Sequence, residues 1–138
     1  MRRILIIDDE KDFCQLVKQH LRLAGKYKAI IAKGGNMGAW FANCRWHKPD
    51  LILLDIMMPG MDGFELLKML KDDKATSHIA VIMVTARTDE EAKARAKSLH
   101  CDGYIVKPIS IKDLVSEIEK ALSKENSGKE RLSEADKQ

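Results

Sequence analysis

Polar side chains stand directly after four short apolar runs of this chain. They supply three carboxylates, one hydroxyl and one ammonium, from Asp8, Asp9, Asp55, Thr85 and Lys107. If the apolar runs are parallel neighbours in one sheet, their carboxyl ends meet at one edge, where the binding sites of α/β folds collect. This set of groups suits a divalent cation together with a phosphoryl group.

The three carboxylates have a metal-binding interpretation and a structural one. Asp8, Asp9 and Asp55 would raise one another's pKa at close range unless a cation intervenes, and oxygen ligands suit Mg²⁺. Alternatively, Asp8 and Asp9 open the following helix as caps, a role that Asp12 could share. Asp55 is followed by a turn at 59–63 rather than a helix, so we interpret it as a nucleophile that could form an acyl phosphate.

The hydroxyl and the ammonium are suited to contact a phosphoryl group. Thr85 could donate a hydrogen bond to a phosphoryl oxygen, and Lys107 could pair with its charge. Each also has a plain structural interpretation, as a β-branched strand end and a surface lysine. Tyr104 can be interpreted as a half-buried strand aromatic. The Lys107–Pro108 peptide could be cis.

The elements that must position these groups alternate along the chain. Apolar runs predict strands, and residues at helical spacing predict helices between them. Alternation of this kind implies right-handed crossovers and a parallel sheet with helices on both faces. We therefore expect a flavodoxin-like, doubly wound α/β fold of strand order 2-1-3-4-5, with strands at 4–7, 29–32, 51–54, 80–84 and 103–106.

Helix starts are indicated by capping residues. Thr88 with Glu91 has capping-box spacing, Asp62 precedes a helix that begins near Gly63, and Ser110 caps the last helix. The helix after Thr88 is rich in Ala and charge, so we expect it to move easily. The helix over 39–44 is the least regular.

Composition bounds the class of protein. The 138 residues favour one domain over 1–122, followed by a polar tail or linker at 123–138 that is disordered or extends the last helix by a turn or two. The net charge is only +3, which argues against direct nucleic-acid binding. The sequence has no membrane span and no signal peptide, and its cysteines Cys14, Cys44 and Cys101 form no motif, so we expect a cytoplasmic location with reduced thiols.

These motifs together resemble the receiver domain of two-component response regulators. The resemblance covers about residues 3–122 and rests on the acidic pair at 8–9, the segment 49–63 around Asp55, the run 84–86 and the Lys-Pro pair at 107–108. The resemblance implies that Asp55 is the phosphoacceptor. It also implies that Asp8, Asp9 and Asp55 bind Mg²⁺ together with the main-chain carbonyl of Met57. Finally, it implies that Thr85 and Lys107 contact the phosphoryl group and that Thr85 and Tyr104 form a switch.

The chain departs from the family's usual pattern in three places. His100 stands where the family usually has Gly, so it must adopt a left-handed backbone or change the turn. Ile109 follows Pro108 where Phe is more usual, and the segment 35–38 makes the second helix atypical.

The expected function is a phosphoacceptor receiver rather than an enzyme, beyond catalysis of its own phosphorylation and dephosphorylation. A histidine kinase or a histidine phosphotransfer protein would donate the phosphoryl group. Output would go to a downstream protein partner or to self-association, through the helix after Thr88, the strand 103–106 and the last helix. Alternatives are a Mg²⁺-dependent phosphohydrolase, which would need an acid where Met57 stands, a flavodoxin-like electron carrier, and a non-phosphorylated interaction module.

Overall fold

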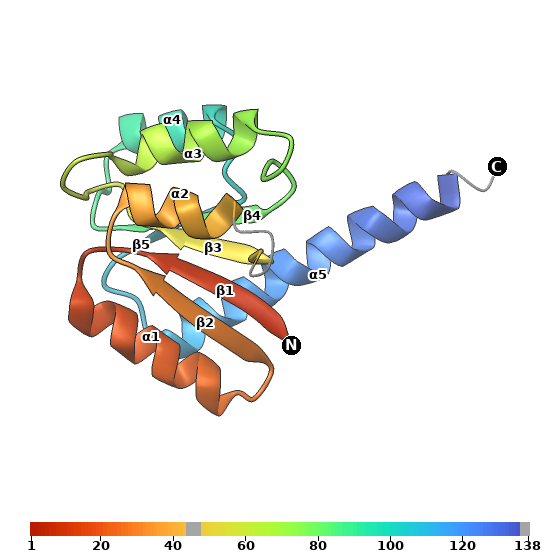
Figure 1. Cartoon of the computed structure of the whole chain (residues 1–138), viewed down its shortest axis with the longest axis horizontal. Helices are drawn as coiled ribbons and strands as arrows, with labels where there is room; N and C mark the ends of the chain where they lie inside the picture. The colour runs from red at the N-terminus through yellow and green to blue at the C-terminus, as the bar shows by residue number, and fades with distance from the viewer. Residues whose placement is uncertain (44–47, 136–138) are drawn as a thin grey trace.

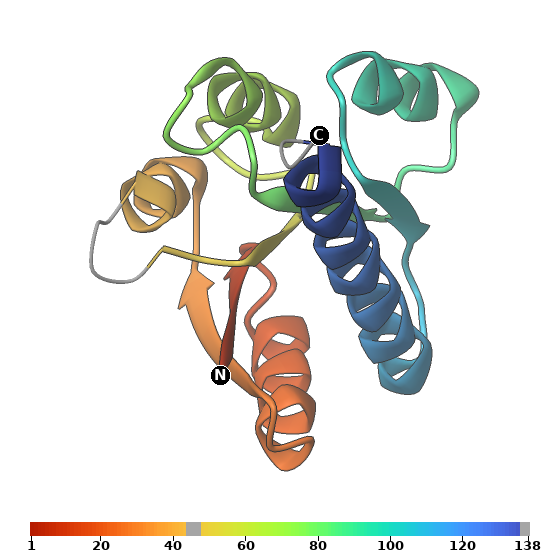
Figure 2. The same ribbon diagram turned by 90° about the vertical axis from the view of Figure 1, so that its right-hand side faces the viewer.

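The computed structural model describes residues 1–43 and 48–135, and they form a sheet between two layers of helices (Figure 1). Helices α2, α3 and α4 cover one face of the sheet, and α1 and α5 cover the other (Figures 1 and 2). The strands are β1 (Arg2–Ile7), β2 (Tyr27–Ala32), β3 (Leu51–Leu54), β4 (Ala80–Thr85) and β5 (Gly103–Val106). The helices are α1 (Lys11–Leu23), α2 (Gly35–Asn43), α3 (Gly63–Asp72), α4 (Glu90–Ser98) and α5 (Ile111–Ala135).

The sheet has the strand order β2-β1-β3-β4-β5, and every pair is parallel. This confirms the flavodoxin-like order predicted from the sequence. The order reverses between β1 and β3, so the crevice at their carboxyl ends is the expected site. β2 starts at Tyr27, two residues before the predicted start, and β4 ends at Thr85 itself.

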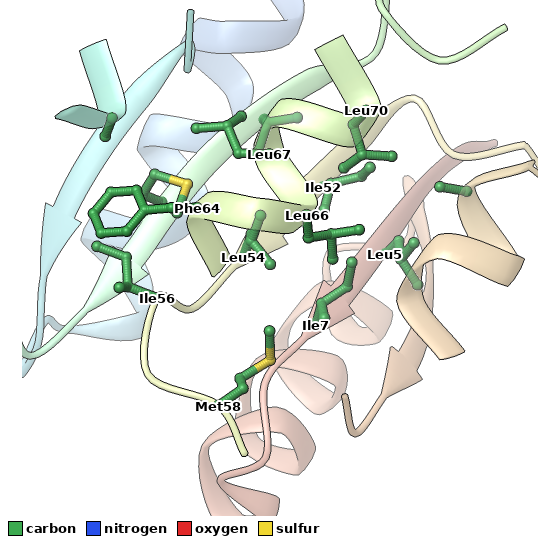
Figure 3. Packing of buried hydrophobic residues seen from close by; sticks show 14 of the residues in the cluster. Leu5, Ile7, Ile52, Leu54, Ile56, Met58, Phe64, Leu66, Leu67 and Leu70 are labelled. Atoms are coloured by element: carbon green, nitrogen blue, oxygen red, sulfur yellow. The ribbon is translucent and has the colours of Figure 1, made fainter. Parts of the chain in front are cut away.

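Two apolar cores lie on the two faces of the sheet. Under α2, α3 and α4, alternate residues of the strands, such as Ile52 and Leu54, pack against Leu66, Leu67 and Leu70 of α3 (Figure 3). On the other face, the remaining alternate strand residues pack against α1 and α5. Burial of both faces explains why the strands read as continuous apolar runs.

Two of the three predicted helix caps are confirmed. The Asp62 carboxylate accepts a hydrogen bond from the main-chain N–H of Glu65, and Ser110 Oγ accepts one from that of Asp113. The predicted cap at Thr88 is wrong. Asp89 caps α4 instead, because its carboxylate accepts from the main-chain N–H of Ala92.

Several local features follow the sequence pattern. His100 adopts φ 67, which is one of the two outcomes expected where Gly is usual, and the Lys107–Pro108 peptide is cis.

Two helices differ from their predicted bounds. α2 spans Gly35–Asn43, so it begins before the predicted 39–44, and Cys44 lies outside the described residues. α5 passes the expected domain boundary at 122 and projects from the body beyond the predicted turn or two (Figure 1). No helix in the described part of the chain has the length and apolar character needed to cross a membrane.

Candidate functional site

The parallel register brings two acidic strand ends together. Ile7 of β1 lies opposite Leu54 of β3, so Asp8 and Asp55 are the next residues on adjacent strands. The main-chain N–H of Asp55 donates to the carbonyl of Ile7 at 3.0 Å, and that of Asp8 donates to the carbonyl of Ala32 at 3.1 Å. Both main chains are thus tied to a neighbouring strand, and both residues are buried, with 2% of Asp8 and 7% of Asp55 exposed.

Asp9 adds a third, exposed carboxylate to this pair. One ligand oxygen from each of Asp8, Asp9 and Asp55 lies within 4.8 Å of the others. Burial raises the pKa of the Asp8 carboxyl, and the charge of Asp55 acts in the same direction, although hydrogen bonds from Lys107 and from the main chain of Glu10 oppose them. A cation would offset the repulsion, and three hard oxygen donors at this spacing fit Mg²⁺.

The turn after β3 places Met57 beside the same cluster. Its main-chain N–H donates to Asp55 Oδ1 at 3.2 Å, while its side chain points outward and is 59% exposed. The assignment of its carbonyl as a metal ligand stays a prediction.

Lys107 brings a positive charge into the cluster from the end of β5. Its Nζ lies 2.7 Å from Asp8 Oδ2, 3.0 Å from Glu10 Oε2 and 3.6 Å from Asp55 Oδ2. Burial by itself would lower the pKa of Lys107, but the hydrogen bonds to Asp8 and Glu10 and the charges of Asp8 and Asp55 outweigh it and raise the pKa to about 12. Lys107 therefore carries a positive charge at neutral pH.

Two contacts of Lys107 were not anticipated from the sequence. Glu10, next to the acidic pair, accepts a hydrogen bond from its ammonium, and the ring of Phe13 lies with its centroid 4.2 Å from Nζ. The ring face adds a cation–π contact. Glu10 is adjacent to the acidic pair, which was an available signal, whereas nothing in the sequence linked Phe13 to a lysine so distant along the chain.

Thr85 is fully buried at the end of β4. Its main-chain carbonyl accepts from the N–H of Lys107 at 2.8 Å, which ties the two predicted phosphoryl contacts together. Its Oγ accepts a long hydrogen bond, 3.4 Å, from the main-chain N–H of Arg87. The hydroxyl is thus at the correct edge of the sheet and only weakly engaged.

Tyr104 is linked to the loop that follows Thr85. Its hydroxyl donates to the main-chain carbonyl of Arg87 at 2.9 Å, and its ring packs partly against the core under α4. The Arg87 side chain pairs with the α4 cap Asp89 at 2.8 Å. Arg87 therefore connects Thr85, Tyr104 and the start of α4, a role that its position in the sequence did not indicate.

The alternative interpretation of the acidic pair as helix caps does not hold. α1 has its N-cap at Glu10 without a side-chain cap hydrogen bond, and Asp12 lies in the first turn. Asp8 accepts from the main-chain N–H of Glu10, which turns the chain toward α1, and also from Lys107. Asp9 is exposed and contributes the third carboxylate of the cluster.

The start of α3 packs closely against the main chain of Asp55 and Ile56. A Cβ on Gly63 would lie 2.6 Å from Ile56 Cα and closer still to the main-chain oxygen of Asp55. Only a residue without a side chain allows this approach, and the Gly63 N–H uses it to donate to the carbonyl of Ile56 at 3.0 Å.

Comparison with known proteins agrees with this architecture. The family model of the response regulator receiver domain matches residues 4–119. The phosphate regulon transcriptional regulatory protein PhoB of Pseudomonas aeruginosa is 38% identical over 127 residues, which is 92% of this chain and 54% of that protein. The heme response regulator HssR of Staphylococcus haemolyticus is 39% identical over 122 residues, 88% of this chain and 52% of that protein.

Solved structures give the same result. A CheY-like response regulator receiver domain protein from Methanospirillum hungatei has a TM-score of 0.84 and 31% identity, and the match covers 93% of this chain and 98% of that one. The receiver domain of the Francisella response regulator 1452 has a TM-score of 0.81 and 27% identity, with 90% and 98% covered. The chain spans about half the length of the curated relatives but nearly all of these structures.

Proposed function

The chain belongs to the response regulator receiver domain family, and we propose that Asp55 is its phosphoacceptor. The observation that carries the proposal is the position of the Asp55 carboxylate. It is nearly buried at the end of β3, within 4.8 Å of two further carboxylates and 3.6 Å from the Lys107 ammonium. A nucleophilic carboxylate needs such surroundings, because negative charge develops on the phosphoryl oxygens during transfer.

The proposed reaction is phosphoryl transfer from a phosphohistidine. An Asp55 oxygen forms a bond to phosphorus while the phosphorus–nitrogen bond of the donor breaks, and its electron pair stays on the imidazole. The product is an acyl phosphate on Asp55. In this proposal, Lys107 pairs with a phosphoryl oxygen and the Thr85 hydroxyl donates to another. The chain would catalyse this transfer and its own dephosphorylation but no turnover of a separate substrate.

Mg²⁺ is the proposed cofactor. Asp8, Asp9 and Asp55 would hold it, with the carbonyl of Met57 as a further oxygen ligand. When bound, the ion would supply positive charge that stabilises the phosphoryl oxygens. The main-chain N–H of Met57 orients Asp55 Oδ1, and burial leaves only 7% of Asp55 exposed.

The test is incubation with acetyl phosphate and Mg²⁺, followed by intact-mass measurement. The wild-type protein should gain the mass of one phosphoryl group, and Asp55→Asn should gain none. If Asp55→Asn takes up the same mass, the assignment of the acceptor is wrong.

The proposed switch is formed by Thr85 and Tyr104. If Thr85 Oγ turns toward a phosphoryl group, it leaves the 3.4 Å contact with the Arg87 N–H. Arg87 also accepts from Tyr104 and pairs with the cap of α4. α4 buries only Ala92 and Ala96, so a shift of this helix loses little packing.

Partners and domain organisation are part of the same proposal. The donor is a histidine kinase or histidine phosphotransfer protein in the cytoplasm, and output passes through the face of α4, β5 and α5 to a protein partner or to a second copy. A hollow there, about 460 Å³, is lined by Tyr104, by Lys93 and Lys97, and by Asp102, whose charge is paired with Lys71. The two lysines favour an acidic partner surface. Residues 1–122 form the receiver proper, and 123–138 serve as a linker, of which 123–135 continue α5.

The phosphohydrolase and electron-carrier alternatives lack their defining residues. Met57 stands where a second catalytic acid is needed, and acids replace the phosphate-binding loop that a flavin carrier needs after β1. The family match also speaks against both. A non-phosphorylated interaction module does not need the Asp8–Asp9–Asp55–Lys107 cluster, which is complete in this chain.

A further inference from the structure

The ammonium of Lys107 lies closer to Asp8 and Glu10 than to Asp55. An ammonium has three N–H donors. Asp8 at 2.7 Å and Glu10 at 3.0 Å lie within hydrogen-bond distance, whereas Asp55 at 3.6 Å does not. Two of the three donors are engaged by Asp8 and Glu10, so these contacts restrain any movement of the ammonium toward a phosphoryl oxygen on Asp55.

The two acceptors differ in what else they do. Asp8 belongs to the carboxylate cluster and is fixed by β1, with 2% of its side chain exposed. Glu10 lies outside that cluster, and its side chain is 59% exposed. Its contact with Lys107 is therefore the one that the proposed phosphoryl-transfer site does not require.

We propose that Glu10 is a positioning residue that retains the Lys107 ammonium near α1 and so slows phosphorylation of Asp55. This inference rests on the proposed function, because it concerns how readily Lys107 reaches the phosphoryl group. Phe13 of α1, the helix that Glu10 precedes, reinforces this position of the ammonium. The centroid of its ring lies 4.2 Å from Lys107 Nζ.

Three variants separate contact from charge. Glu10→Gln keeps the side-chain shape but removes the charge. Glu10→Asp keeps the charge but is one methylene shorter, so we expect the 3.0 Å contact with the ammonium to be lost. Asp12→Asn is the matched control, because it removes one exposed negative charge two residues from Glu10. Within the described part of the chain, Asp12 is not among the carboxylates that pair with Lys107.

The first measurement is the rate of phosphoryl uptake from acetyl phosphate with Mg²⁺, followed by intact mass. Glu10→Gln and Glu10→Asp should both accelerate uptake by about two- to fivefold, the range expected from loss of one exposed ion pair. Asp12→Asn should change the rate by much less. The second measurement is the dissociation constant for fluoroberyllate, a phosphoryl mimic, which should fall by a similar factor in both Glu10 variants while thermal unfolding shows that each is folded.

Each remaining result contradicts the inference. Acceleration by Glu10→Gln alone would mean that Glu10 repels the donor through its charge and does not position Lys107. Unchanged or slower uptake in Glu10→Gln would mean that Glu10 is neutral or presents Lys107 to the phosphoryl group. Failure of the wild-type protein to take up phosphate at Asp55 would instead count against the proposed function, and the Asp55→Asn protein identifies that case.

Discussion

The Lys107 ammonium lies 2.7 Å from Asp8 and 3.6 Å from Asp55. Lys107 thus joins the end of β5 to the end of β1 across the intervening strands β3 and β4. Because both ends of this pair are held by the sheet, its geometry depends on the strand order rather than on local loops. The Lys107–Asp8 pair therefore fixes where the positive charge lies relative to Asp55, the proposed acceptor.

Lys107→Met should lower the free energy of unfolding by about 3 kcal/mol near neutral pH, because it leaves the buried Asp8 carboxylate without its cation. Urea unfolding of both proteins measures the difference.

The pH dependence of this difference has a defined sign. The pKa of Lys107 is raised from 10.5 to about 12, so its stabilisation is fully present below pH 10.5 and is lost as pH rises through about 12. The pKa of Asp8 is raised from 3.8, so protonation in acid relieves its burial cost. The deficit of the variant should shrink toward both extremes, and a deficit that grows in mild acid would contradict this account.

Asp9→Asn should weaken Mg²⁺ binding at least tenfold, since it removes one of three clustered carboxylates. The metal-free fold should be unchanged or slightly more stable, because repulsion is relieved. Isothermal titration and thermal unfolding check both parts, with Asp12→Asn as the control. An unchanged Mg²⁺ affinity would show that the ion binds elsewhere.

Gly63→Ala should destabilise the protein by more than about 2 kcal/mol, because the new Cβ meets the main chain of Asp55 and Ile56 rather than a movable side chain. It should also slow phosphorylation, since Asp55 is displaced. Gly34→Ala is the matched control, as its Cβ meets nothing within 4 Å. Equal unfolding midpoints for the two variants would mean that α3 can retreat without loss.

Fluoroberyllate should produce its largest amide shifts between Thr85 and Val106, the segment that holds Arg87, α4 and Tyr104. The reason is that Thr85, Arg87 and Tyr104 are linked by successive hydrogen bonds. Tyr104→Phe, which lacks the hydroxyl, should reduce the shifts across α4 while leaving those at Asp8 and Asp55. Shifts confined to the three acids in the wild-type protein would refute the relay.

Charge reversal at Lys93 and Lys97 should weaken binding of the output partner without changing phosphorylation of Asp55. Both lysines line the hollow beside Tyr104 and lie away from the acid cluster. Charge reversal at Lys18 and Lys26, exposed on or beside α1, is the control for net charge. If both pairs of reversals weaken partner binding equally, the α4 face is not the specific surface.

The sheet and its polar edge were predictable from the order of residue types along the chain. Apolar runs without polar interruption, separated by helical patterns, indicate strands buried on both faces, and the residue after each run then emerges at the carboxyl edge. Asp8, Asp55, Thr85 and Lys107 were therefore predictable as one group. At His100 the family resemblance left open a left-handed backbone or a changed turn, and the structure shows the left-handed backbone. The cap of α4 was not predictable, because Thr88 and Asp89 are both good capping residues and only the path of the backbone selects Asp89.

The contacts within that group depend on the folded arrangement of the elements. The distances from the Lys107 ammonium to Asp8, Glu10 and Asp55 differ by less than 1 Å. These differences are set by the register of the parallel strands and by the placement of α1. The link from Tyr104 to the Arg87 carbonyl involves a main-chain group, which carries no residue-specific signal. Sequence patterns report burial and periodicity, whereas such contacts arise from packing between elements that are distant along the chain.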